Sequence, residues 1–83
     1  MGGLNNINNM LQYTDEKVAD CNDCKVQRIY QLTNPSNKPS FMTSFILKCE
    51  GDNYLKSQYA TDETNVIAYR AYYNGKWSDW RKI

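Results

Sequence analysis

Hydrophobic residues follow one spacing before about residue 24 and a different spacing after it. In the first part they recur at steps of three, four, seven and three residues, at Leu4, Ile7, Leu11, Val18 and Cys21. With Thr14 in the gap, this is the a/d pattern of a heptad repeat, which indicates a helix with a narrow apolar stripe. Because so thin a stripe would bury little against a globular core, we expect residues 1–24 to form a short coiled-coil stalk between identical chains.

Two observations leave another interpretation of this segment open. Asn5, Asn6, Asn8 and Asn9 are indifferent helix formers, and the run is shorter than three full heptads. Thr14 followed by two acidic residues also has the form of an N-cap that opens a separate short helix. The alternative to a stalk is therefore a frayed amphipathic helix that lies on the rest of the protein.

From residue 25 onwards apolar and polar residues alternate, which is typical of β-strands with one buried face. The sequence predicts four strands, at residues 25–32, 41–49, 54–59 and 66–73. Loops or turns are predicted at residues 33–40, 50–53 and 60–65, which are rich in turn-forming residues. The dipeptide Asn74-Gly75 is the strongest hairpin signal and favours a type I′ turn. We therefore expect residues 25–83 to form a small antiparallel β knob, in a chain that is mainly β with an N-terminal helix.

The hairpin turn also predicts which residues face each other across the two strands. The expected pairs are Tyr73 with Lys76, Tyr72 with Trp77, Ala71 with Ser78, Arg70 with Asp79 and Tyr69 with Trp80. One face would then carry Arg70, Tyr72, Trp77 and Asp79, where each cross-strand pair contributes roughly 0.2–1 kcal/mol. A cation–π contact between Arg70 and an indole ring is expected on the same ribbon.

The size of the knob indicates that it needs further support. A domain of about 60 residues buries only about 60% of the surface of its unfolded chain, so it is marginally stable alone. Such small folds usually depend on disulfides, a metal ion or oligomerisation. Together with the heptad pattern, this favours a self-associating chain.

Charge and composition exclude several functional classes. Ten Lys plus Arg against nine Asp plus Glu leave a net charge of +1, with both signs dispersed. A nucleic-acid or anionic-membrane footprint would need clustered positive charge. No apolar run reaches the length of a membrane span, and residues 1–6 lack the basic and apolar regions of a signal peptide. We expect a soluble protein made in the cytoplasm, without a cofactor.

Three cysteines are the main candidates for metal or redox chemistry. Cys21 and Cys24 form a C-x-x-C motif, and Cys49 stands alone further on. A structural zinc site needs four ligands and usually pairs two such motifs or adds histidine, which this chain lacks. We interpret the cysteines as small, partly buried thiols and expect no metal. The alternative is a three-cysteine site completed by Asp20, Asp23 or Glu50.

An enzymatic function is not expected. Without histidine, acid–base catalysis would need two carboxylates held together in a pocket. The adjacent pair Asp62-Glu63 does not meet this need, because neighbouring residues of an extended chain point apart.

The C-terminal part of the chain resembles a known domain. The residues that carry the resemblance are Gln58 at the end of one strand, Arg70 in the next, and the closing run Asn74, Gly75, Trp77, Ser78 and Trp80. They resemble the pyocin-knob domain of bacteriophage tail fibres and of the fibres of phage-tail-like bacteriocins, over roughly residues 26–83. The resemblance implies a homotrimeric fibre tip on a virion, which contacts other fibre or capsid proteins and adheres to bacterial surface glycans such as lipopolysaccharide or teichoic acid. The alternative is a structural protein of the virion, either a decoration or a head-fibre or trimerisation module, that does not bind a receptor.

Most motif residues are expected to be structural. Trp77 and Trp80 would fill the knob core or subunit contacts, Arg70 would pair with Asp79 or strand carbonyls, and Gln58 would satisfy buried backbone groups. Receptor contacts are expected from loops on the rigid scaffold, with aromatic rings as stacking surfaces for sugars. The candidate ligand-binding residues are Asn34, Lys38, Tyr54, Asp62, Asn65 and Tyr73.

Overall fold

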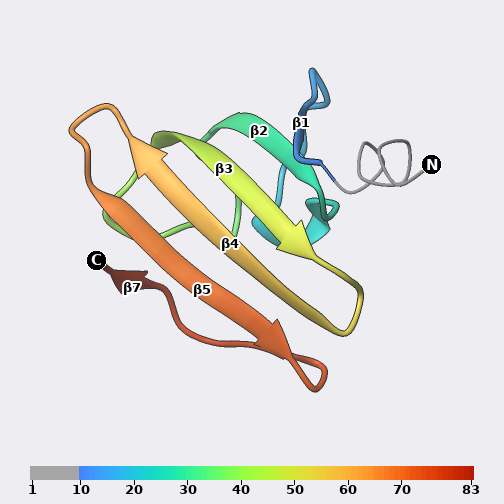
Figure 1. Cartoon of the computed structure of the whole chain (residues 1–83). Helices are drawn as coiled ribbons and strands as arrows, with labels where there is room; N and C mark the ends of the chain where they lie inside the picture. The colour runs from blue at the N-terminus through green and yellow to red at the C-terminus, as the bar shows by residue number, and fades with distance from the viewer. Residues whose placement is uncertain (1–9) are drawn as a thin grey trace.

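Alternation of buried and exposed residues after residue 27 produces a curved antiparallel sheet. The computed structural model describes residues 10–83 (Figure 1). Its elements are β1 (Gln12–Tyr13), the 3-10 helix η1 (Cys21–Asp23), β2 (Arg28–Thr33), β3 (Ser44–Gly51), β4 (Leu55–Asp62), β5 (Ile67–Tyr73), β6 (Lys76–Trp77) and β7 (Arg81–Lys82). The strands follow the order β1-β2-β3-β4-β5-β6, and β7 pairs with β5 as well. The four predicted strands correspond to β2, β3, β4 and β5.

The predicted N-terminal helix and coiled-coil stalk are wrong. Within residues 10–24 the chain is extended, with β1 pairing in parallel with β2, and its short helical turn is η1. Cys21, expected on a seam between chains, is fully buried in the core, and Val18 packs against that core. The spaced apolar residues therefore anchor an irregular segment to the sheet rather than line a helix. Leu11 lies in this extended segment, whereas Leu4 and Ile7 lie outside the described residues.

Local hydrogen bonds explain why this segment is not helical. The amide of Gln12 donates to the Gln27 carbonyl at 3.2 Å, and the amide of Thr14 donates to the Ile29 carbonyl at 3.1 Å. Thr14 also accepts a bond from the Glu16 amide, in a local turn that opens no α-helix. The edge of β2 thus supplies the backbone partners that a helix would have supplied internally.

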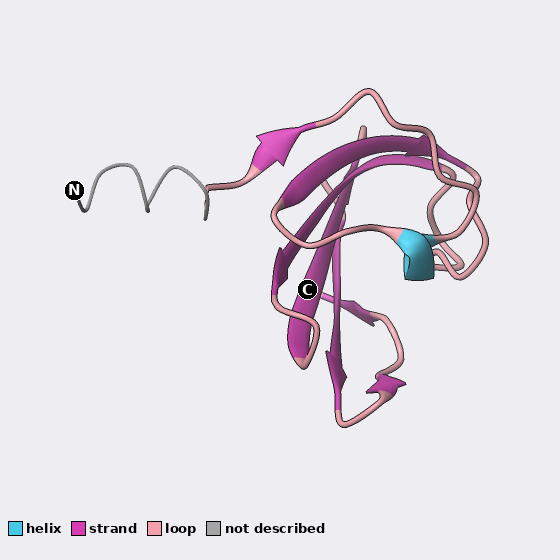
Figure 2. Cartoon of the chain, turned by 90° about the vertical axis from the view of Figure 1, so that its right-hand side faces the viewer, coloured by secondary structure: helices cyan, strands magenta, loops and turns pink. Residues whose placement is uncertain are grey.

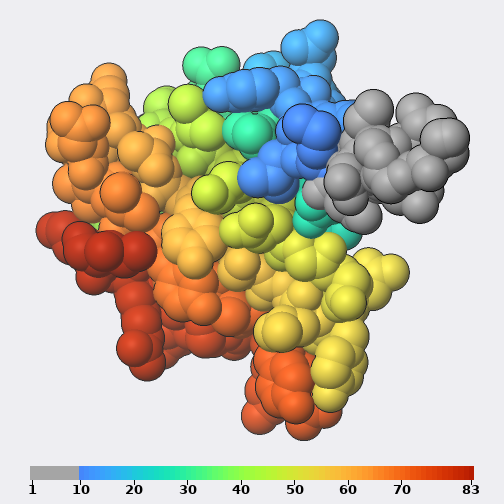
Figure 3. All heavy atoms as spheres, viewed as in Figure 1, coloured from blue at the N-terminus to red at the C-terminus, as the bar shows by residue number. Residues whose placement is uncertain are grey.

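One face of the sheet carries the core and the other is open. The core residues are Cys21, Cys24, Tyr30, Leu32, Met42, Phe45, Leu47, Cys49, Ala60 and Ala68. In β3 the buried residues alternate with exposed or half-buried ones, as the two-residue period of a strand requires. The loops that contain η1 and the β2–β3 connection lie on the core side of the curved sheet (Figure 2). Figure 3 views the opposite side, which we call the open face.

The predicted hairpin register holds near the turn and fails beyond it. Tyr72 pairs with Trp77 and Tyr73 with Lys76, which confirms the two innermost pairs. Further out, Tyr69 pairs with Arg81 where the prediction placed Trp80, so the strand after Ser78 contains one extra residue. Such a bulge turns the following side chains to the other face. The hydroxyl of Ser78 accepts a bond from the Ala71 amide at 3.1 Å, which occupies a donor of the regular ladder.

Two side-chain-capped turns set the ends of β4. The carboxylate of Asp52 accepts bonds at 2.8 Å from the amides of Tyr54 and Leu55, which closes the β3–β4 turn. Gly51 in this turn has φ +119°, and a Cβ there would meet the Leu55 carbonyl oxygen, so only glycine fits. At the other end, Asp62 accepts bonds from the amides of Thr64 and Val66 in the β4–β5 turn. These turns place Tyr54 and Asp62 at opposite ends of the sheet.

Candidate functional site

The motif residues Gln58 and Arg70 meet on the core side of the sheet. They are direct cross-strand partners on β4 and β5, and both are buried. Arg70 Nε donates to Gln58 Oε1 at 2.9 Å, and an Arg70 terminal nitrogen donates to Asn22 Oδ1 at 2.8 Å. Gln58 Nε2 in turn donates to the Cys21 carbonyl at 2.8 Å, so it satisfies a buried backbone group. This network ties η1 to the centre of the sheet.

Two tryptophans complete the surroundings of Arg70. Its guanidinium carbon lies 3.9 Å from the centroid of the Trp77 ring and 4.7 Å from that of Trp80. The Trp80 indole nitrogen donates to the Asn37 carbonyl at 2.9 Å, which joins the β2–β3 loop to the same cluster. The bulge after Ser78 makes this arrangement possible, because it brings Trp80 to the face of Arg70.

Arg70 acts as an internal clamp with partners that the sequence did not suggest. Asp79, the expected partner, is exposed, whereas the hydrogen-bond acceptors are Gln58 and Asn22. Burial lowers the pKa of Arg70. Among residues 10–83, every buried side-chain nitrogen and oxygen has a hydrogen-bond partner. Asn22 lies inside the C-x-x-C motif, and nothing in that motif predicts a bond to Arg70.

The three cysteines are buried free thiols on the core side of the sheet. Cys49 Sγ lies 3.8 Å from the Cys24 carbonyl oxygen and 3.7 Å from Gln58 Nε2. Burial raises the pKa of Cys21 to about 11 and also raises the pKa of the other two thiols. Within residues 10–83, no group of three or more Cys, Asp or Glu residues is arranged to hold a metal ion. The thiols thus have the character of core side chains.

We expect the folded protein to react slowly with a thiol reagent. A pKa of about 11 for Cys21, two units above its ordinary value of 9.0, reduces the thiolate fraction at pH 8 about a hundredfold. The measurement is the rate of reaction with an aromatic disulfide reagent at pH 8, with and without denaturing urea. Equal rates in the two conditions would contradict the buried placement.

The same pKa shift gives the sign of the pH dependence. Because the folded state holds the thiol proton more tightly, its stabilising effect is full below pH 9.0 and is lost as pH rises towards about 11. The raised pKa of Tyr30 acts in the same direction. The urea midpoint is therefore expected to fall between pH 8 and pH 10.5.

The structure places the predicted ligand-binding residues in separate parts of the molecule. Tyr54 and Tyr73 lie together beside the β5–β6 hairpin. The others lie in the β2–β3 loop and the β4–β5 turn and include Asp62 and Asn65, whose turn is closed by a backbone bond between them. Lys38 donates to the Pro39 carbonyl at 3.3 Å. Hydrogen bonds from Thr64 lower the pKa of Asp62, whose carboxylate is thus engaged in turn formation.

Tyr54 and Tyr73 form an exposed aromatic pair. Their ring centroids are 5.3 Å apart in an edge-to-face arrangement, and their hydroxyl oxygens are 3.4 Å apart. The side chains remain 62% and 54% exposed. In the space-filling view, the β3–β4 turn and the end of β5 lie side by side at the lower edge of the molecule (Figure 3). Two aromatic rings thus project at one end of the open face.

A shallow groove of about 380 Å³ lies beside this pair. Its lining residues are Glu50, Gly51, Leu55, Lys56, Ser57, Tyr69 and Ala71. Leu55 is the cross-strand partner of Tyr73, which connects the groove to the tyrosine pair. We call this surface, with Tyr54 and Tyr73 at its end, the tyrosine groove. The sequence did not single out Glu50, Ser57 or Tyr69 as ligand-binding residues, although strand alternation places all three on the face opposite the core.

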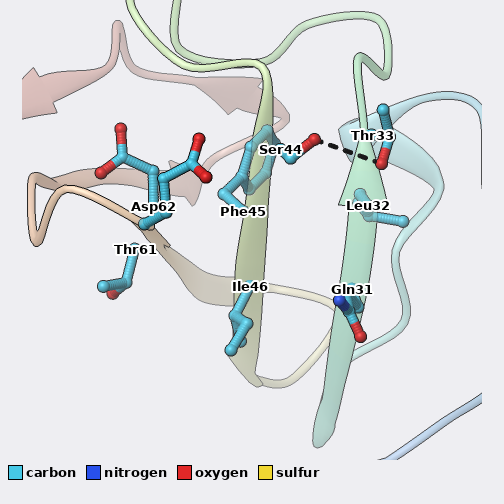
Figure 4. A pocket seen from close by; sticks show the side chains of 9 residues that line it. Gln31, Leu32, Thr33, Ser44, Phe45, Ile46, Thr61 and Asp62 are labelled. Atoms are coloured by element: carbon cyan, nitrogen blue, oxygen red, sulfur yellow. Dashed lines mark hydrogen bonds between the residues drawn. The ribbon is translucent and has the colours of Figure 1, made fainter.

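A second groove of about 360 Å³ lies at the other end of the sheet (Figure 4). Its lining residues are Gln31, Leu32, Thr33, Ser44, Phe45, Ile46, Thr61, Asp62 and Glu63. The Ser44 hydroxyl bonds to that of Thr33 at 3.3 Å, and Asp62 is held in its turn. This groove has hydroxyl groups but lacks exposed rings, so the tyrosine groove is the better candidate for a sugar.

A scan against protein-family models and searches of curated proteins and of solved structures give no match to this chain. Within residues 10–83, no helix has the length and apolar character needed to cross a membrane.

Proposed function

We propose that this protein is an adhesion module at the tip of a virion fibre, either a tail fibre or another appendage, and that it binds a glycan on the bacterial host surface. The observation that carries the proposal is the exposed Tyr54–Tyr73 pair beside a groove. The resemblance of residues 26–83 to pyocin-knob domains supports the virion setting.

The chemistry of the tyrosine groove suits a sugar. Aromatic rings offer broad apolar surfaces on which sugar C–H groups stack, and ordering them has a low entropic cost. The Glu50 carboxylate and the Ser57 hydroxyl line the groove and can accept hydrogen bonds from sugar hydroxyls. Apolar stacking beside a few polar groups is the usual composition of a small-ligand site.

Removing both rings tests the proposal. The double variant Tyr54→Ala/Tyr73→Ala is expected to bind its glycan about tenfold or more weakly, because exposed aromatic anchors contribute most of the energy of such contacts. The measurement is binding to a panel of purified lipopolysaccharides, teichoic acids and capsular polysaccharides. Tyr13→Ala is the matched control, because Tyr13 is also exposed but lies on β1. Absence of wild-type binding across the panel, or equal binding by the double variant, would reject the proposed function.

A structural role in the virion is the second candidate. Ile46, Leu55 and Ile67 are exposed apolar side chains on the open face, a composition that suits contact with another protein. In either role we propose a homotrimer that contacts other fibre or capsid proteins, because so small a domain gains stability from such contacts. A decoration protein would bind the virion particle and would leave host attachment unchanged when deleted.

A further inference from the structure

Four side chains form a continuous row across the open face. Lys48 is paired with Tyr59, Tyr59 with Tyr69, and Tyr69 with Arg81 in the strand register. Residues directly opposite each other in a sheet project from the same face, about 5 Å apart. The Tyr59 and Tyr69 ring centroids are 5.0 Å apart, and Lys48 Nζ lies 5.1 Å from the centroid of Tyr59. We call these four residues the cation–tyrosine row.

The row points away from the core. Its neighbours along β3, β4 and β5 are buried core residues, and the two-residue period of a strand turns the row to the other side. Tyr69 also lines the tyrosine groove, so the row and the groove share a wall. A ligand that spans Tyr69 would therefore contact both surfaces.

The two cations of the row have no carboxylate partner among residues 10–83. The salt bridge in this part of the chain joins Lys25 to Glu16, so neither Lys48 nor Arg81 has a carboxylate oxygen within 4.0 Å. Two positive charges thus flank two half-buried aromatic rings on the open face. Glu50 is the acidic residue that lines the tyrosine groove, and it follows Lys48 by two positions on β3.

We propose that the cation–tyrosine row binds an acidic sugar of the glycan, one that carries a carboxylate or a phosphate. The sugar ring packs against the exposed parts of Tyr59 and Tyr69, and its negative group pairs with Lys48 or Arg81. Adjoining sugars lie in the tyrosine groove, where Glu50 accepts bonds from their hydroxyls. This inference rests on the proposed function and specifies that the glycan carries a negative charge.

Two other occupants fit this surface less well. A nucleic acid would need a wider positive surface, whereas the chain has a net charge of +1. A second copy packed with its own row against this one would bring lysine and arginine side chains of the same sign together, which is unfavourable.

The test compares matched acidic and neutral probes on the full chain. The probes are tetragalacturonic acid for the carboxylate, a glucosylated ribitol-phosphate oligomer for the phosphate, and a neutral galactose tetrasaccharide. The wild-type protein is expected to bind at least one acidic probe about tenfold more tightly than the neutral one in 50 mM salt, and the preference is expected to shrink at 500 mM. The Lys48→Gln/Arg81→Gln variant is expected to lose this preference, so that it binds acidic and neutral probes equally.

Lys17→Gln/Lys25→Gln provides the control, because it removes the same charge from side chains in the N-terminal segment. Circular dichroism establishes that both double variants are folded. Equal wild-type binding of acidic and neutral probes would overturn the inference, and so would an unchanged preference in the Lys48→Gln/Arg81→Gln variant. Tighter binding of a thymidine oligonucleotide than of either acidic probe would also overturn it. Neutral binding that depends on Tyr54 and Tyr73 would leave the proposed function standing in each case.

Discussion

Replacing Arg70 with methionine is expected to lower the free energy of unfolding by about 3 kcal/mol. The substitution leaves the buried Gln58 oxygen and the Asn22 side chain without the arginine donors that they bond. It also removes the cation that lies over Trp77 and Trp80. The measurement is urea unfolding followed by tryptophan fluorescence.

Two further variants separate the clamp from general effects of charge. Arg81→Met removes an exposed arginine and is expected to change stability by less than about 0.5 kcal/mol. Arg70→Lys keeps the charge but lacks the planar guanidinium, which forms the hydrogen bonds and also stacks on the tryptophan rings. It is therefore expected to lower the free energy of unfolding by most of the amount expected for Arg70→Met. A stability of Arg70→Met close to that of the wild type would contradict the role of the clamp.

Replacing Leu47 with alanine is expected to cost about 3 kcal/mol of stability. Leu47 is fully buried on β3, so the change removes apolar contacts and leaves a cavity in the core. The adjacent residue Ile46 is 43% exposed on the open face, and Ile46→Ala is expected to cost less than about 1 kcal/mol. Thermal and urea unfolding of the two variants compare the two faces of one strand directly. Equal losses of stability in the two variants would mean that the open face is as buried as the core face, which would contradict the fold.

The β part of the fold was predictable because its signals are local. Alternation predicted the strands that became β2 to β5, and Asn74-Gly75 predicted the turn and the pairing of Tyr72 with Trp77. The register beyond Ser78 was not predictable from turn geometry, since the bulge depends on a side-chain bond to the Ala71 amide. This single added residue decides whether Trp80 or Arg81 lies opposite Tyr69.

The N-terminal segment shows why a spacing of apolar residues is ambiguous. Cys21 and Val18 fit a heptad seam, but the same spacing also occurs in an irregular segment that runs along a core and buries a side chain every few residues. The competing partner was the open edge of β2, which the sequence alone did not reveal. Gln58 and Arg70 were identified individually from the sequence, whereas their link to Asn22 required the position of η1.

The candidate site was only partly visible in the sequence for a related reason. Tyr54 and Tyr73 were selected separately as loop or turn rings, and the register of β4 with β5 brings them together. Asp62 and Asn65 were selected by the same reasoning, but they form their own turn at the far end. Loop position therefore identified exposed residues without showing which of them share a surface.

Glycan binding at the open face is tested most directly by amide NMR shift mapping on the full chain. The titrant is the polysaccharide that binds most tightly in the panel. We predict that the largest shifts occur at Glu50, Tyr54, Ser57, Tyr69 and Tyr73, with little change at core residues. Absence of shifts, or shifts confined to the β2–β3 loop on the core side, would contradict a ligand site on the open face.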